Sequence, residues 1–116
     1  MNIEDFRNYC ISKKGVTEEF PFDENALVFK VKGKIFAIAD VDLYHSINLK
    51  CVPETAIELR EKFSAILPGY HMSKKHWNSI LMDNTIPDHL VYQWIDDSYL
   101  LVVKKLSLKE QKFLEA

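Results

Sequence analysis

The sequence has no hydrophobic run long enough to cross a bilayer. Its longest apolar stretches, Ile35 to Ala39 and Tyr99 to Val103, are only a few residues each, whereas a transmembrane helix needs about 20 apolar residues. The first residues, Met1 to Asp5, are acidic, and a secretory signal peptide would begin with basic residues. We therefore expect a cytoplasmic protein that has no membrane partner.

Potential metal ligands and catalytic motifs are also scarce. The two cysteines, Cys10 and Cys51, lie far apart and form no C-x-x-C pattern, so we expect reduced core thiols. His71 and His76 could become neighbours across a hairpin, but no third ligand is evident, and we expect no metal site and no cofactor. The sequence shows no phosphate loop, nucleophile elbow or paired-carboxylate motif, so we expect no enzymatic activity.

The composition is that of an ordinary globular protein. Hydrophobic residues make up 47% of the 116 positions and charged residues 28%, and no repeat or low-complexity segment is visible. A chain of this length can bury a sufficient core without a disulfide or a metal ion. We expect one domain over residues 1–116; the sequence leaves the oligomeric state open, and we favour a monomer.

Hydrophobic periodicity predicts a mixture of helices and strands. Predicted helices cover residues 3 to 14, a segment from Pro53 with buried Ala56, Leu59, Phe63 and Ile66, a segment from Ile86 through Ile95, a segment from an Asp97-Ser98 cap to about Lys105, and a short segment after a Ser107–Glu110 capping box. Predicted strands cover Phe20 to Phe22 at an edge, Ala26 to Val31, Lys34 to Ala39, Ser46 to Cys51, Tyr70 to Met72, and Trp77 to Met82. The alternation of apolar and polar residues in Ser46 to Cys51 indicates a sheet with one wet face.

A tight hairpin is predicted around Lys32-Gly33, because glycine supplies the positive φ that a two-residue turn needs. With this loop, Phe29 should lie opposite Phe36, Leu27 opposite Ile38, and Lys30 opposite Ile35 on the other side of the sheet. Lys30 and Lys50 could then share the wet face.

Positive charge is unevenly distributed along the chain, although the net charge is −2. Residues 25 to 39, 43 to 53 and 62 to 82 contain seven lysines and no acidic residue. The third window includes Pro68 to Ile80, where Lys74 and Lys75 lie between two histidines and two large aromatic residues. Charged groups that must stay hydrated, next to rings that favour burial, are typical of a binding surface or a polar hairpin tip.

Several stretches resemble the MmcQ/YjbR-like family: Phe20-Pro21-Phe22, Ile47 to Cys51 followed by Pro53-Glu54, and above all Pro68 to Met72 with Lys74 to Asn78. The resemblance covers nearly the whole chain, and it implies a two-layer α+β domain in which helices cover one face of an antiparallel sheet of about five strands. Members are usually described as DNA-binding through a double-wing likeness. The sequence departs from the family pattern at Val52, where an Asp would cap the next helix, and at Ser73, often Asn.

Two functions remain open from the sequence. The first is a DNA-binding domain whose basic hairpins contact phosphate. The second is a protein-interaction module that binds a partner by its sheet face or edge, without catalysis. The candidate nucleic-acid contacts are Lys30, Lys32, Lys34, Lys50, His71, Lys74, Lys75, His76, Trp77 and Asn78.

Overall fold

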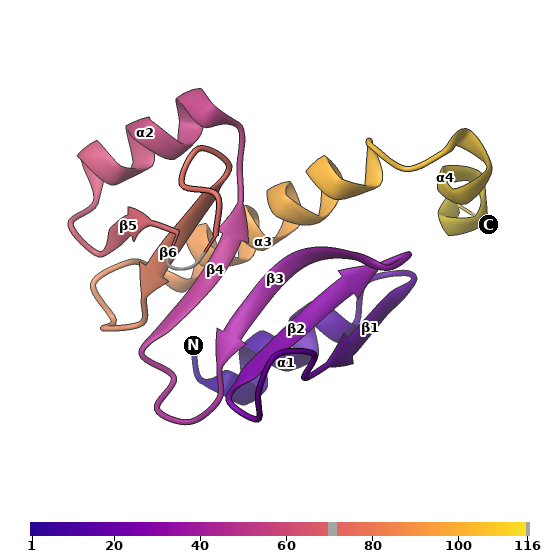
Figure 1. Cartoon of the computed structure of the whole chain (residues 1–116). Helices are drawn as coiled ribbons and strands as arrows, with labels where there is room; N and C mark the ends of the chain where they lie inside the picture. The colour runs from indigo at the N-terminus through magenta and orange to yellow at the C-terminus, as the bar shows by residue number, and fades with distance from the viewer. Residues whose placement is uncertain (70–71, 116) are drawn as a thin grey trace.

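A computed structural model describes residues 1–69 and 72–115. Its centre is a six-stranded antiparallel sheet in the order β1-β2-β3-β4-β6-β5 (Figure 1). The strands are β1 (Val16–Glu19), β2 (Ala26–Val31), β3 (Lys34–Asp40), β4 (Ser46–Lys50), β5 (Ile66–Pro68) and β6 (Trp77–Leu81). The predicted α+β class and antiparallel sheet are confirmed, with six strands in place of about five.

Four helices accompany the sheet: α1 (Ile3–Ile11), α2 (Pro53–Lys62), α3 (Asp88–Val103) and α4 (Leu108–Glu115). α1 and α3 pack against the first four strands, and α2 packs against β5 and β6. Phe6 of α1 meets Phe29 of β2 edge to face, with ring centroids 5.7 Å apart. Both rings are fully buried, so the core lies between the sheet and these helices.

The predicted two-residue turn between β2 and β3 is confirmed. Lys32 and Gly33 both have positive φ, at 51° and 78°, as a type I′ turn requires. Lys30 lies opposite Ile35 as expected, but the register shifts by one residue after this pair. Such a shift marks a β-bulge, in which two residues of one strand oppose a single residue of the other.

The bulge makes two predicted pairings wrong. Phe29 lies opposite Ala37, not Phe36. Leu27 lies opposite Ala39, not Ile38. Phe36 is nevertheless fully buried, because its ring packs edge to face against Tyr99 of α3 at 5.4 Å.

The second hairpin begins earlier in the chain than predicted. α2 ends at Lys62, and Ile66 is the first residue of β5, so the prediction of Ile66 as part of the helical stripe is wrong. β5 pairs with β6, with Pro68 opposite Asn78. Of the predicted strand Tyr70 to Met72, the first two residues lie outside the described part of the chain, and Met72 lies in a bend.

Two further predicted boundaries are wrong. Asp97 and Ser98 do not begin a new helix, since α3 is continuous from Asp88 to Val103. The edge strand is Val16–Glu19, and the predicted strand Phe20 to Phe22 lies in the following loop.

In contrast to the predicted Asp97-Ser98 cap, the expectations for the starts of α2 and α4 are confirmed. Val52 provides no side-chain cap for α2. Ser107 and Glu110 form the expected reciprocal bonds at the start of α4. Within the described residues, no helix has the length and hydrophobicity needed to span a bilayer.

Candidate functional site

The strand order brings several lysines of distant sequence position to one end of the sheet. The antiparallel pairing places the Lys32-Gly33 turn, the last residue of β4 and the first residue of β6 at the same end. The C-terminal residues of α3 reach this end as well, because Val102 and Lys105 line a groove with Lys34 and Lys50. This arrangement concentrates positive charge where three strands and a helix meet.

The groove at this end has a volume of about 330 Å³. Its described lining residues are Lys34, Ile35, Lys50, Val102, Lys105 and Leu106. Lys104 lies next to Lys105 and lines a neighbouring pocket together with Lys50. We refer to Lys34, Lys50, Lys104 and Lys105 as the lysine cluster. None of the ion pairs found among the described residues includes a member of this cluster.

Lys50 is the central member of the cluster, because it lines both the groove and the neighbouring pocket. Its backbone N–H donates a 2.9 Å hydrogen bond to the hydroxyl of Ser98 on α3. The pKa of Lys50 is lowered from its ordinary value, first by burial of the ammonium group and second by the charge of Lys105. Both causes disfavour the charged form of this side chain, and an anionic ligand would offset them.

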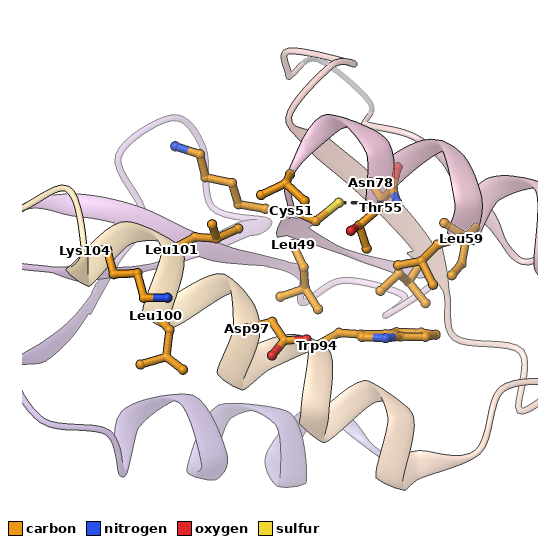
Figure 2. A pocket seen from close by; sticks show the side chains of 14 residues that line it. Leu49, Cys51, Thr55, Leu59, Asn78, Trp94, Asp97, Leu100, Leu101 and Lys104 are labelled. Atoms are coloured by element: carbon orange, nitrogen blue, oxygen red, sulfur yellow. Dashed lines mark hydrogen bonds between the residues drawn. The ribbon is translucent and has the colours of Figure 1, made fainter.

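The neighbouring pocket lies between α2 and α3 over β4 and β6, and its volume is about 250 Å³. Figure 2 shows Cys51, Thr55 and Asn78 on one side of it and residues of α3, including Trp94 and Asp97, on the other. Most of its lining is aliphatic or aromatic. The pocket is therefore an apolar space with charged residues at its border.

Two candidate lysines of the first hairpin have partners within the protein. Lys30 forms an ion pair with Glu19 of the adjacent edge strand. The ammonium group of Lys32 lies 3.6 Å from the ring centroid of Phe113 on α4, a cation–π contact. Among the described residues, no ion pair or cation–π contact involves Lys34, the third candidate of this hairpin.

Lys74 and Lys75 are exposed in the turn that precedes β6. The guanidinium group of Arg60 donates a 2.7 Å hydrogen bond to the backbone carbonyl of Lys74, which attaches this turn to α2. His76 is half-buried, and its carbonyl accepts a 2.9 Å hydrogen bond from the N–H of Cys51. The two lysine side chains thus form a second exposed basic site at the same end of the sheet.

Trp77 and Asn78 are buried, with exposed fractions of 7% and 3%. The side-chain amide of Asn78 donates a 3.3 Å hydrogen bond to the carbonyl of Ala56, so it connects β6 to α2. These two residues have structural positions, and neither is available on the surface for stacking on a base. His71 lies outside the described residues.

The described part of the chain contains no group of three or more histidine, cysteine or acidic residues that could hold a metal ion. Cys10 is buried, and Cys51 is half-buried. Burial raises the pKa of both thiols, with a smaller opposing effect of Lys13 on Cys10 and of Arg60 on Cys51. Neither thiol is activated as a nucleophile.

Sequence reasoning missed two members of the lysine cluster. It placed Lys104 and Lys105 at the C-terminal end of a helix, which is where they lie. Their proximity to Lys34 and Lys50 depends on how α3 crosses the sheet. A local pattern does not encode that crossing.

Comparisons with known proteins agree with this fold. A crystal structure of the Deinococcus radiodurans protein DR2400, described as a DUF419 domain, superposes with a TM-score of 0.93 at 38% identity, over 98% of this chain and 88% of the other. The uncharacterised Escherichia coli K12 protein YjbR is 32% identical over 115 residues, which is 98% of each chain. The uncharacterised protein YbdF of Escherichia coli O157:H7 is 38% identical over 94 residues, covering 80% of this chain and 77% of YbdF.

The family model described as YjbR matches residues 11–101. This range begins at the end of α1 and includes all six strands, α2 and most of α3. The chain belongs to the YjbR family.

Proposed function

We propose that this protein binds duplex DNA through its phosphate backbone, with the lysine cluster as the main contact and Lys74 and Lys75 as a second one. The observation that supports this proposal is the groove shared by Lys34, Lys50 and Lys105, whose described lining contains no acidic residue. Cations placed together without counter-charges repel one another. A polyanion that approaches this groove relieves the repulsion, and it releases counterions from the DNA.

The opposite end of the sheet strengthens the electrostatic argument. The loops and strand ends located there contain Asp23, Glu24, Asp40, Asp42 and Asp83, and α3 begins nearby with Asp88. The sheet therefore has a cluster of carboxylates at the end opposite the lysine cluster. A protein with this distribution approaches DNA with its basic end forward, although its net charge is −2.

The expected mode of binding does not depend on base sequence. Phosphate contacts by lysine fix the position of a protein on DNA without reading bases. Trp77 and Asn78, the candidates for base contact, are buried. We therefore expect modest affinity that depends strongly on salt. The proposed role is binding alone and includes no catalytic step.

The second function considered from the sequence is binding of a protein partner by the sheet face or edge, and its edge mode, strand addition, has less support. The edge strand β5 has three residues and ends in Pro68, which has no backbone N–H to donate. The other edge strand, β1, has four residues and contains Glu18 and Glu19, which are paired with Arg7 and Lys30. Short edges with charged side chains hinder the pairing of an added strand.

A matched pair of charge variants tests the proposal. Lys105→Gln removes one exposed charge from the groove, and Lys62→Gln removes one exposed charge near the end of α2, away from the groove. Fluorescence anisotropy with a labelled duplex at low salt should show several-fold weaker binding for Lys105→Gln and no change for Lys62→Gln. Equal effects of the two substitutions would show that DNA affinity depends on net charge and not on the position of the lysine, and they would contradict the proposed surface.

A further inference from the structure

We propose that the pocket between α2 and α3 binds a small organic carboxylate with an apolar body about the size of an aromatic ring. The inner part of the pocket supplies apolar contacts and its border supplies positive charge. This site is separate from the groove, although the two have Lys50 in common.

The apolar part of the ligand would lie against the sheet. Leu49, Ile66 and Ile80 are nearly fully buried and line the pocket from β4, β5 and β6. Leu59 of α2 and the indole of Trp94 on α3 extend the apolar lining onto the two helices (Figure 2). Side chains of this kind bind a hydrocarbon body by removing it from water.

The volume limits the size of the ligand. An apolar cavity of about 150 Å³ accepts a molecule such as benzene. The present pocket measures about 250 Å³, which leaves room for a ring, a short linker and a carboxylate. A larger group such as a nucleotide would extend beyond this space.

The charged residues at the pocket border determine the charge of the ligand. Lys50 and Lys104 contribute two ammonium groups, and Asp97 contributes the one acidic side chain among the described lining residues. α2 begins at the same border, and Val52 gives its first turn no side-chain cap. Uncapped N–H groups at a helix start favour an anion. Two cations, one carboxylate and an uncapped helix start together select a monoanion.

A ligand in this pocket should also affect DNA binding, an effect that rests on the proposed function. Lys50 lines the pocket and the groove. A carboxylate bound at Lys50 therefore neutralises part of the lysine cluster. The ligand should weaken DNA binding without occupying the groove.

Phenylacetate and phenylacetamide provide a direct test, because they have nearly the same shape and differ in charge. Titration monitored by Trp94 fluorescence and by calorimetry should show saturable binding of phenylacetate. Phenylacetamide should bind about tenfold more weakly or worse, because it lacks a charge-assisted contact. Equal affinities of the two compounds, or no binding of phenylacetate, would overturn the proposal. The Trp94→Phe variant should lose the fluorescence change on binding, since the other tryptophan, Trp77, does not line the pocket.

Val52→Asp is the most informative variant. Val52 is 41% exposed at the N-cap of α2, so the new carboxylate can cap the helix without a core change. The melting temperature should rise, which shows that the variant folds, and phenylacetate affinity should fall at least about tenfold, because the pocket border has its own anion. Unchanged phenylacetate affinity in this folded variant would contradict the site. Lys62→Gln, outside the pocket, should bind phenylacetate as the wild type does.

The DNA measurement is separate from the binding measurement. If saturating phenylacetate weakens duplex binding several-fold while phenylacetamide does not, the coupling through Lys50 is supported. If phenylacetate binds and DNA affinity stays constant, the coupling is wrong and the pocket assignment stands. If wild type binds no DNA at all, the proposed function fails and phenylacetate binding still decides the pocket.

Discussion

Ser98 accepts a hydrogen bond from the backbone N–H of Lys50 at 2.9 Å, and its hydroxyl donates to the carbonyl of Phe36 at 2.6 Å. One buried side chain of α3 thus connects β3 and β4. The direct pairs between these strands end at Ala37 and Leu49, so Ser98 satisfies two backbone groups beyond that point. The same contact holds Lys50 at the junction of groove and pocket.

Ser98→Ala should destabilise the fold by about 1 to 3 kcal/mol, because it removes the partner of the part-buried N–H of Lys50 and of the buried carbonyl of Phe36. Ser64→Ala, at an exposed position after α2, should change stability by less than about 0.5 kcal/mol. Urea unfolding of both variants measures the difference. Similar stabilities for the two variants would show that Ser98 is not a required bridge.

Phe36→Ala should cost about 3 to 5 kcal/mol, since it removes a fully buried ring. Phe22→Ala removes the same atoms at a position that is 68% exposed, and it should have almost no effect. Denaturant titration of both variants makes this comparison. A cost below about 1 kcal/mol for Phe36→Ala would contradict the packing of Phe36 against Tyr99.

Tyr9 should make stability depend on alkaline pH. Its hydroxyl donates a 2.7 Å hydrogen bond to Asp96, and this bond, with burial and the carboxylate charge as smaller causes, raises the pKa of Tyr9 to about 12. The ordinary tyrosine pKa is about 10. A raised pKa stabilises the fold fully below the unfolded value, and this contribution is lost as pH rises through about 12.

The measurement is the free energy of unfolding of wild type and Tyr9→Phe between about pH 8 and pH 12. The difference in free energy of unfolding between wild type and Tyr9→Phe should be constant at the lower pH values and should shrink as Tyr9 ionises. Taking the difference between the proteins cancels the titration of lysines common to both. Parallel profiles over the whole range would show that the bond to Asp96 does not affect stability.

Lys74→Ala combined with Lys75→Ala should weaken binding to unrelated duplexes about equally, because exposed lysines contact phosphate and not bases. The melting temperature should hardly change, since both side chains are exposed. Anisotropy with two duplexes of different sequence measures this. A loss of affinity for only one of the duplexes would indicate base contact. Unchanged affinity for both would exclude this turn from the DNA-binding surface.

The sequence predicted the parts of the fold that follow from local chemistry. The Lys32-Gly33 turn and the Ser107–Glu110 cap both lie where expected. The bulge between Phe29 and Lys30 was not predictable, because it depends on how Phe36 packs against a distant helix. Ser98 has the side chain of a helix cap, yet it lies in the middle of α3, since two strand groups need its hydroxyl.

The candidate site was predictable only in part for the same reason. Lys34 and Lys50 were identified from charge patterning, and the structure places both in the groove. Lys30 and Lys32 had the same sequence pattern, but neighbours on β1 and α4 pair with them. Trp77 was a candidate for stacking on a base, because aromatic and basic residues surround it in the sequence, but its side chain is buried. Charge and aromatic content identify candidates, and tertiary neighbours decide which of them remain exposed.

The most direct test of DNA binding by the lysine cluster is the salt dependence of affinity. Wild type and the Lys34→Gln, Lys105→Gln double variant are titrated with one duplex between about 50 mM and 200 mM salt. The logarithm of the wild-type association constant should fall linearly with the logarithm of salt concentration, and the slope of the double variant should be shallower by up to about two units, one for each lost phosphate contact. Equal slopes for the two proteins, or no wild-type binding at the lowest salt, would contradict the claim.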